Sequence, residues 1–536
     1  VVINELVCEG CGDCSVQSNC LSVEPLETEF GRKRQINQST CNKDLSCVKG
    51  FCPSFVTVEG GQLKKKTKGS QSVASPADLG PLPEPVLPGL GGAQQDVWGI
   101  VVAGVGGTGV ITIGQLLGVA AHLDGKGIVT QDSGGLAQKG GATWSHVLIG
   151  ATQQAIRTTR VSMAAADLIM GCDPIVTAGK ETVLRMASGR TRVALNVHST
   201  PTAGFVKDGN WQNPAQACAQ EIAKAVGEAA VGSFNADAAA VKLLGDSLYT
   251  NPMMLGYAWQ KGWIPLSRAS LLRAMELNAV AVAQNQTAFE WGRHAAHDWG
   301  AVAKLLDPGQ VIEFRRPPAL DEVISQRVAF LTAYQNAAYA QDYLACVNKV
   351  RQAESTGGAS LSLSEAVARN LFKLMAYKDE YEVARLHADA AFHRRIGDMF
   401  EGDFSLHYHL APPLLAKKND KGELQKQKFG PATLKLFKLL AALKGLRGTA
   451  LDVFGRSEER RQERALIVEY KACVEELLRG LGDFSDAGQL RLALDIARVP
   501  EQIKGFGHVK ARNLAAARQN WQALVARFRA TAPARL

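Results

Sequence analysis

Seven of the chain's eleven cysteines lie within its first 52 residues. They are Cys8, Cys11, Cys14, Cys20, Cys41, Cys47 and Cys52, and the last of them precedes a proline. A short loop with three thiols two residues apart can wrap one corner of an inorganic cluster, and a distant fourth thiol can close the cage. The spacing therefore predicts an iron–sulfur protein.

The order of the cysteines assigns a first cluster. In bacterial-type ferredoxins, three thiolates come from one closely spaced run and the fourth comes from a Cys-Pro pair in the other half. We therefore assign Cys8, Cys11, Cys14 and Cys52 to one 4Fe–4S cluster.

The cysteines that remain for a second cluster are less regularly spaced. Cys20, Cys41 and Cys47 remain for it, so a second four-iron centre needs a ligand other than cysteine. Three thiolates could hold a three-iron centre, or a four-iron centre completed by water, substrate or an aspartate such as Asp44. The sequence leaves these alternatives open.

Two other uses of the cysteines fit less well. A zinc ribbon pairs two Cys-x2-Cys knuckles, and the chain from Cys41 onward has none. Disulfides suit an oxidising compartment, whereas no signal peptide or transmembrane run precedes the cysteines, so we expect a cytoplasmic protein. Because the chain starts at Val1 and not at Met, we expect it to be the back part of a longer polypeptide.

Length and composition predict several domains. A chain of 536 residues allows about three or four domains. Its net charge of +9 accompanies no nucleic-acid motif, so we expect solubility or the docking of an acidic partner, and no nucleic-acid or membrane partner. After a first module over residues 1–60, residues 61–96 are rich in Lys, Ser and Pro, and this composition predicts an extended linker.

An α/β domain is expected over residues 97–298. A strand at residues 100–103 runs into a glycine turn, and an apolar helix pattern follows from Val110. The turn contains Gly104, Gly106, Gly107, Thr108 and Gly109. Glycines allow close approach of the backbone, and the helix N-terminus offers amide donors to a phosphate. The alternatives are that the glycines only permit tight packing, or that they bind NAD with Asp132 on the ribose.

Further strand patterns at residues 127–131, 143–149, 168–170 and 192–197 alternate with helices, which predicts a mostly parallel, doubly wound sheet. Between two of them, residues 132–146 form a loop rich in glycine and polar groups that suits a ligand. Lys139, Arg157 and Arg160 are candidate phosphate contacts or ordinary solvated residues. His146 is a candidate acid or base without a visible partner, and Cys172 is expected to be a buried, inert thiol.

Residues 299–536 are expected to be mostly helical, with helix patterns at 361–374, 434–446 and 457–478. His407 and His409 could bind a metal, although a structural role is favoured. Residues 417–422 are expected to form an exposed loop that Lys426 and Lys428 continue. The sequence assigns no chemical role to this region, so we expect it to pack against the rest of an enzyme.

Taken together, these motifs resemble those of indolepyruvate ferredoxin oxidoreductase, of the 2-oxo acid:ferredoxin oxidoreductase family. The resemblance rests on the cysteine module, the linker, the turn at 104–109, the loop at 135–141 and the Asn-Pro-Met-Met-Leu-Gly motif at 251–256. More narrowly, the motifs resemble the C-terminal portion of the long fused bacterial form. It implies a multidomain α+β and α/β protein with a ferredoxin-like iron–sulfur module, a doubly wound gamma domain and a helical C-terminal region.

The resemblance also implies an activity: oxidative decarboxylation of 2-oxo acids, particularly aryl pyruvates, to acyl-CoA, with ferredoxin as electron acceptor. Coenzyme A is the co-substrate, and thiamine diphosphate and magnesium would lie on upstream domains of a homo-oligomer. This chain contains no Gly-Asp-Gly, the motif that holds magnesium and diphosphate in thiamine enzymes, so alone it should not cleave the carbon–carbon bond. An NAD-linked iron–sulfur reductase and a non-enzymatic electron carrier are the rival hypotheses.

Overall fold

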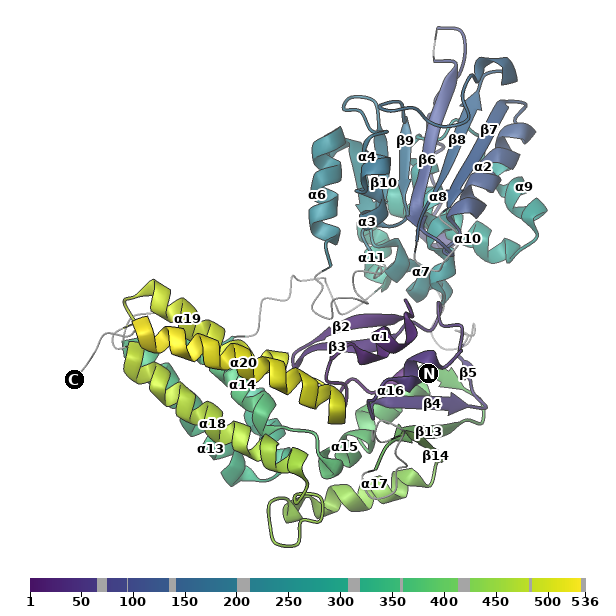
Figure 1. Ribbon diagram of the computed structural model, residues 1–536. Coiled ribbons are helices and arrows are strands. Elements are labelled where there is room, and N and C mark those ends of the chain that lie inside the picture. Colours follow the sequence, from purple (N-terminus) through teal and green to yellow (C-terminus); the bar gives the residue numbers. More distant parts are fainter. Residues whose placement is uncertain are drawn as a thin grey trace. The chain divides into compact units, whose positions relative to one another are not determined.

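Two stretches of the chain that are far apart in sequence fold together. The computed structural model describes residues 1–64, 75–93, 95–134, 141–199, 213–306, 319–356, 360–412, 425–481 and 484–531. Unit 1 comprises Val1–Lys64 and Phe314–Leu536, and unit 2 comprises Lys65–Glu313 (Figure 1). The cysteine-rich segment thus belongs to the same unit as the C-terminal region.

Unit 2 is built on a six-stranded sheet in the order β11-β10-β9-β6-β8-β7. Its strands are β6 (Val97–Val105), β7 (Gly127–Gly134), β8 (Ala142–Gly150), β9 (Leu168–Gly171), β10 (Arg192–Asn196) and β11 (Val231–Phe234). β6, β9, β10 and β11 pair in parallel, whereas β8 lies antiparallel between β6 and β7. The predicted strands and the mostly parallel sheet are confirmed.

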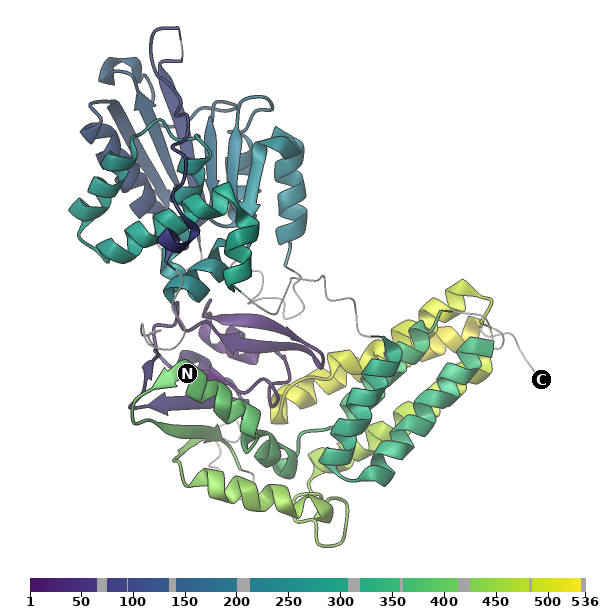
Figure 2. The ribbon, with the colours of Figure 1, turned by 180° about the vertical axis from the view of Figure 1, so that it is seen from behind.

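Helices cover both faces of this sheet (Figures 1 and 2). They are α2 (Val110–Leu123), α3 (Pro174–Thr177), α4 (Lys180–Val183), α6 (Ala215–Val226), α7 (Ala236–Leu244), α8 (Thr250–Gln260), α9 (Arg268–Asn278), α10 (Val282–His297) and α11 (Trp299–Leu306). Side chains of β6 alternate between the two cores: Ile100 and Val102 face one, and Val101 faces the other. Such alternation is what a strand buried on both faces requires.

The linker predicted at residues 61–96 differs from the structure over residues 75–93. This segment packs on unit 2 through Leu79, Leu87 and Leu90. Gln260 Nε2 also donates a hydrogen bond of 2.7 Å to the carbonyl oxygen of Pro83. Although the segment is rich in proline, its three leucines supply enough apolar surface to bind it to the domain that follows.

The start of the helical C-terminal region also differs from the predicted residue 299. α11 belongs to unit 2, where the ring of Trp299 lies 5.3 Å from that of Phe234 and Val302 is buried in the core. A helix pattern alone carries no information about which neighbouring core the helix joins.

In unit 1 the N-terminal segment forms short elements around the cysteines. They are β1 (Val2–Ile3), α1 (Asp13–Ser18), β2 (Val23–Thr28), β3 (Gly31–Ile36), η1 (Ser46–Lys49), β4 (Phe55–Glu59) and β5 (Gln62–Leu63). β2 and β3 form an antiparallel hairpin, and Phe30 at its turn packs against Phe330 and Phe372. The sheet containing β1 and β4 continues into the C-terminal region in the order β1-β4-β13-β14.

The C-terminal region is mostly helical, as predicted. It contains α12 (Leu320–Tyr334), α13 (Ala337–Thr356), α14 (Ser362–Met375), α15 (Glu380–His387), α16 (Ala390–Met399), β12 (Phe400–Glu401), β13 (Ser405–Leu410), β14 (Gln427–Phe429), α17 (Thr433–Ala442), α18 (Glu458–Leu481), α19 (Ala487–Arg498) and α20 (Gly507–Thr531). The long helices form a bundle with its own apolar core (Figure 1). Among the described residues, no helix is both long enough and apolar enough to span a membrane.

Two glycines allow α8 and α10 to lie against each other. A Cβ atom on Gly256 would lie 1.9 Å from the carbonyl oxygen of Phe289, and one on Gly292 would lie 1.8 Å from that of Met253. The glycine that ends the Asn-Pro-Met-Met-Leu-Gly motif is therefore required by backbone contact between two helices.

We expect Gly292→Ala to lower the free energy of unfolding by about 1–3 kcal/mol or more, because the added methyl overpacks this contact. Urea unfolding followed by far-UV circular dichroism measures the change. Gly397→Ala in α16 is the control, since nothing lies within 4 Å of its added methyl. It should leave stability unchanged or raise it by up to about 1 kcal/mol. Equal stabilities of the two variants would contradict the close helix packing.

Candidate functional site

The loop from Cys8 to Cys14 is shaped by two glycines. Gly10 and Gly12 have φ angles of +67° and +80°, which side chains rarely adopt, so the chain turns sharply between successive cysteines. The Gly10 amide donates a hydrogen bond of 3.3 Å to the Cys8 sulfur. Asp13 accepts a 2.7 Å hydrogen bond from the Phe51 amide, which joins the loop to the segment that carries Cys52.

Four thiols of the module influence one another electrostatically. Burial raises the pKa of Cys14, and Cys8, Cys11 and Cys52 act on it in the same direction. Burial and then Cys8 raise the pKa of Cys52 to about 11, and its sulfur lies 2.9 Å from the Ser54 hydroxyl oxygen. The folded chain therefore brings together the four cysteines that the sequence assigned to the first cluster.

The other three cysteines form a second group. Burial raises the pKa of Cys47 to about 11, and Cys20, Cys41 and Asp44 act in the same direction. The Asp44 carboxylate accepts hydrogen bonds from the backbone amide (2.9 Å) and hydroxyl (2.7 Å) of Ser46. Asp44 thus lies near the second group but is occupied within its own turn.

An iron–sulfur cluster needs free thiols as ligands. All eleven cysteines are free thiols, which excludes disulfides in this structure. In the part of the chain that the structure describes, no three His, Cys, Asp or Glu side chains converge closely enough to hold a single metal ion. A four-iron cluster instead takes each thiolate on a different iron atom, so its thiolates stand farther apart than ligands of one zinc. Buried thiols grouped as four and three fit iron–sulfur ligation, which remains a prediction.

Lys426 lies between the two groups of thiols. Its ammonium donates hydrogen bonds to the carbonyl oxygens of Val48 (2.8 Å) and Gly50 (2.7 Å) and lies 4.9 Å from the centre of the Phe55 ring. Burial lowers its pKa to about 8, while the nearby thiol of Cys52 acts in the opposite direction. The prediction that Lys426 continues an exposed loop is therefore wrong, because its partners come from the other end of the chain.

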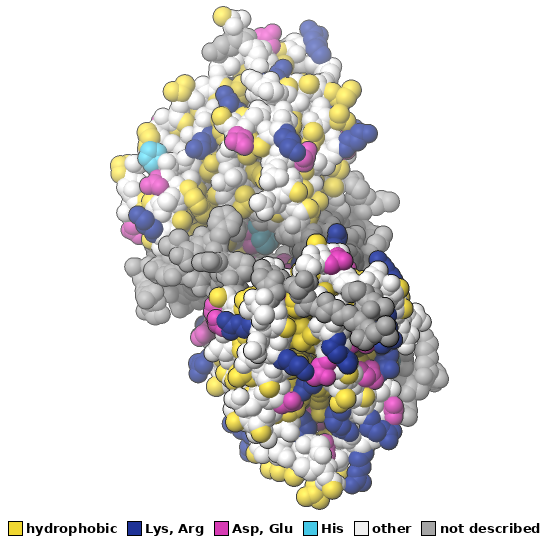
Figure 3. Space-filling view, turned by 90° about the vertical axis from the view of Figure 1, so that its left-hand side faces the viewer, with side chains coloured by type: hydrophobic (Ala, Val, Ile, Leu, Met, Phe, Trp, Pro, Cys, Tyr) yellow, Lys and Arg dark blue, Asp and Glu magenta, His cyan; other side chains and the backbone are white. Residues whose placement is uncertain are grey.

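An open groove of about 520 Å³ lies beside the module. Its walls come from α1, η1, β13, β14 and the start of α20, and they include Asp13, Lys49, Phe51, His409, Lys426, Lys428 and His508. On the face that Figure 3 shows, the basic and acidic side chains of the described residues are interspersed.

The two histidines of the His-Tyr-His run in β13 contact separate partners on β4. His407 Nε2 lies 3.1 Å from a Glu59 carboxylate oxygen, and His409 Nε2 lies 3.2 Å from the Thr57 hydroxyl. Burial, followed by the nearby Lys426, lowers the pKa of His409 to about 4. The favoured structural role fits these contacts.

In unit 2 the glycine turn lies between β6 and α2. Gly107 and Gly109 have φ angles of +85° and +91°, and space is open where a Cβ on Gly107 would stand. Gly104 is different: a Cβ there would lie 2.9 Å from the Cβ of Cys172, so this glycine is needed for packing. The amide of Gly106 donates to the carbonyl oxygen of Gly141 at 2.7 Å. The turn thus combines a structural glycine with an exposed, glycine-dependent tip.

A contact that the sequence did not reveal supports this turn. Asn251 Nδ2 donates a 2.8 Å hydrogen bond to the carbonyl oxygen of Thr108. Asn251 is buried at the start of α8 and opens the Asn-Pro-Met-Met-Leu-Gly motif. Two motifs more than a hundred residues apart are therefore parts of one structure, a link that spacing alone could not show.

Among the other candidates, Arg157 and Arg160 do not lie beside the turn. Lys139 and the loop at 135–140 lie outside the described residues. The charge of Arg160 lowers the pKa of His146, so Arg160 lies near that residue. His146 pairs with Val101 of β6, and Val101 is about 16 Å along the strand from Gly106. The exposed Arg157 follows the end of β8, where Gly150 pairs with the first residue of β6.

Three further predictions have clear structural outcomes. Asp132 lies on β7, which β8 separates from β6, so it does not stand on the neighbouring strand as an NAD-binding acid does. Burial, then Arg185 and Arg160, lower the pKa of His146 to about 4, so its imidazole is neutral near pH 7. Burial raises the pKa of Cys172 to about 12, which agrees with an inert thiol.

Comparison with known families assigns two regions. Residues 99–295 match the family model described as pyruvate ferredoxin/flavodoxin oxidoreductase. Residues 320–523 match a family of unknown function (DUF6537).

Two curated relatives carry the same name, indolepyruvate oxidoreductase subunit IorB. The protein of Methanothermobacter thermautotrophicus is 28% identical over 181 residues, which are 34% of this chain and 87% of the relative. That of Archaeoglobus fulgidus is 36% identical over 75 residues, 14% of this chain and 35% of the relative.

Similar solved structures include pyruvate oxidoreductase subunit PORC of Thermotoga maritima, which is 16% identical with a TM-score of 0.28. The match covers 37% of this chain and 97% of that one. The gamma subunit of a keto/oxoacid ferredoxin oxidoreductase of Geobacter sulfurreducens is 22% identical, with a TM-score of 0.26. The match covers 37% of this chain and 98% of that one. At such TM-scores these likenesses add no weight. The family model and the two named relatives agree, and residues 99–295 of the chain resemble the 2-oxo acid:ferredoxin oxidoreductases.

Proposed function

We propose that this chain is the electron-transfer and gamma-domain portion of a thiamine-diphosphate-dependent 2-oxo acid:ferredoxin oxidoreductase. The observation that carries the proposal is the grouping of seven thiols as four and three, in one chain with an α/β region of this family. An electron-transfer module and a family domain on one polypeptide suit an enzyme that must pass electrons away from its site of oxidation.

The reaction explains why two centres would be useful. A 2-oxo acid anion and coenzyme A yield an acyl-CoA, carbon dioxide, one proton and two electrons. Iron–sulfur clusters, when bound, accept one electron each. Cys8, Cys11, Cys14 and Cys52 would hold the first cluster, and Cys20, Cys41 and Cys47 would hold the second. The buried positions of Cys8, Cys14, Cys47 and Cys52 would keep water from the clusters.

The glycine turn is the proposed phosphate contact of coenzyme A. Gly107, Thr108 and Gly109 precede the N-terminus of α2, where free amides and the helix dipole favour an anion. The open space at Gly107 leaves room for close approach, and Asn251 binds the carbonyl oxygen of Thr108. Gly104 and Gly106 would maintain the conformation of the turn. Lys139 remains a proposed contact.

The other participants follow from the family and from the names of the relatives. Because the curated relatives are named as subunits of indolepyruvate oxidoreductase, we propose an aryl pyruvate such as indolepyruvate as substrate. Since the chain has no Gly-Asp-Gly, thiamine diphosphate and magnesium would be held by other domains or subunits. Ferredoxin would take the electrons in the cytoplasm, and the complex would be a homo-oligomer of such assemblies.

The first test is anaerobic iron and sulfide analysis with low-temperature EPR of the reduced chain. We expect about eight iron atoms per chain, with Cys8→Ser and Cys41→Ser each removing a different signal. Cys172→Ser is the matched control, because this buried thiol belongs to neither group and should leave the iron content unchanged. About four irons, lost only with Cys8→Ser, would leave one cluster, and no iron would refute the redox role.

A second test concerns the glycine turn. Gly107→Ala should weaken coenzyme A binding about tenfold in isothermal titration calorimetry, because loss of one close phosphate contact costs roughly 1.4 kcal/mol. Gly125→Ala at the other end of α2 is the control, since Gly125 also has a positive φ and open space around it. Both variants should lose about 1–2 kcal/mol of stability. Equal affinity of the two variants for coenzyme A would contradict the proposed contact.

A further inference from the structure

Residues 320–523 complete a sheet that begins in the cysteine module. β13 pairs antiparallel with β4, placing Tyr408 opposite Val56, and β12 pairs with β5, placing Phe400 opposite Leu63. Val56, Tyr408 and Phe400 lie in one apolar cluster with Phe392, Ile396 and Phe437. Without this region the outer edge of β4 would be an exposed, unpaired strand edge.

The same region holds the backbone next to the first and last cysteines of the four-thiol group. Lys378 Nζ donates hydrogen bonds to the carbonyl oxygens of Val7 (3.1 Å) and Cys8 (3.2 Å). His387 Nε2 lies 2.8 Å from the carbonyl oxygen of Pro53, the residue after Cys52. Both ends of the loop that bears the four thiols are therefore anchored by residues of one C-terminal segment.

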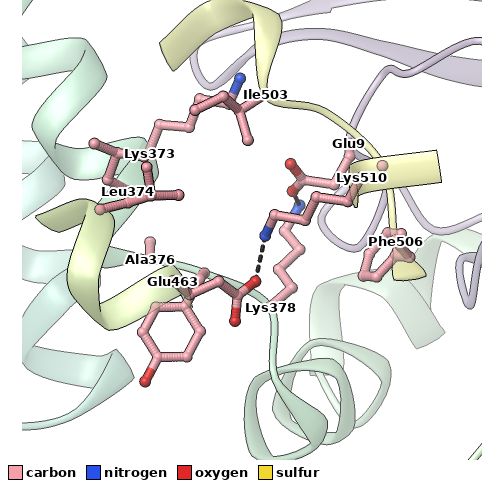
Figure 4. Close-up of a pocket in the computed structure, with 12 residues that line it drawn as sticks. Glu9, Lys373, Leu374, Ala376, Lys378, Glu463, Ile503, Phe506 and Lys510 are labelled. Atoms are coloured by element: carbon pink, nitrogen blue, oxygen red, sulfur yellow. Dashed lines mark hydrogen bonds and ion pairs between the residues drawn. The ribbon is translucent and has the colours of Figure 1, made fainter. Parts of the chain in front are cut away.

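A small polar cavity lies on the Cys8 side of the module (Figure 4). Glu9 reaches into it and forms a 2.6 Å ion pair with Lys378, while Lys510 pairs with Glu463. Lys373 also lines the cavity and donates to the carbonyl oxygen of Pro500. The cavity measures about 20 Å³, which accommodates one water molecule.

Lys426 provides a cation between the two groups of thiols. Its hydrogen bonds go to Val48, next to Cys47, and to Gly50, two residues before Cys52. Its charge acts on Cys52, Cys14 and Cys47, which belong to both groups. Taking up an electron makes a cluster more negative, and a half-buried cation nearby favours that state because water screens it only in part.

We propose that residues 320–523 form the scaffold of the iron–sulfur module and set its reduction potential, with Lys426 as the positioning residue that favours the reduced clusters. This proposal rests on the proposed function, since it requires that the cysteines hold clusters. It gives a role to a region whose family has none assigned.

The experiment compares the whole chain with Lys426→Gln, which removes the charge, and Lys426→Arg, which keeps it. Iron and sulfide content is measured first, and the midpoint potentials are then determined by EPR-monitored redox titration. Lys428→Gln is the matched control, because Lys428 lies two residues further along the chain, in β14, but pairs with the exposed Glu59. Lys426→Gln should bind the same amount of iron and shift at least one midpoint to lower potential, whereas the other two variants should stay near the wild type.

The outcomes separate the two proposals. A wild-type chain without iron refutes the proposed function itself. Wild-type potentials in a Lys426→Gln protein with full iron content overturn the role of Lys426, and so does a shift of the same size in Lys426→Arg. If Lys426→Gln loses iron while Lys426→Arg retains it, the charge is required to hold the clusters and not to set their potential, which overturns the role proposed for Lys426.

Discussion

The antiparallel pairing of β4 with β13 is the interaction on which the cysteine module depends. Alone, β1 and β4 share only two paired positions, and isolated two-stranded sheets are at best marginally stable. The addition of β13 buries Val56 and Tyr408 completely, and β4 begins at Phe55, shortly after Cys52. The position of the thiol that closes the four-cysteine group is thus fixed by a strand from the far end of the chain.

Local patterns predicted the parts of the site that local chain geometry determines. Cys8, Cys11 and Cys14 lie in one loop, and spacing is sufficient to show that their thiols turn to the same side. The strand, glycine turn and helix around Gly107 are likewise contiguous, so periodicity and glycine placement revealed them. The assignment of Cys20, Cys41 and Cys47 to a second cluster stays a prediction.

Contacts between distant segments could not be predicted. Lys426 looked like a residue of a charged loop because its partners, Val48 and Gly50, lie near the opposite end of the chain. Asn251 gave no sign that it binds the carbonyl oxygen of Thr108. The antiparallel direction of β8 was equally hidden, because alternation of side chains is the same in both strand directions. Each missed feature depends on a partner that the sequence does not place.

The helical bundle of unit 1 has consequences for how the module can bind clusters. Small metal domains often fold only with their metal, because the unliganded site has no core of its own. Here the bundle core is formed by residues such as Tyr343, Leu371, Tyr470 and Ile496, and none of the seven N-terminal cysteines belongs to it. The scaffold that presents Lys378, His387 and Lys426 therefore has its own source of stability. Burial that keeps thiols protonated opposes metal binding, and a prefolded scaffold with nearby cations offsets that cost, because cations favour the thiolate form that iron requires.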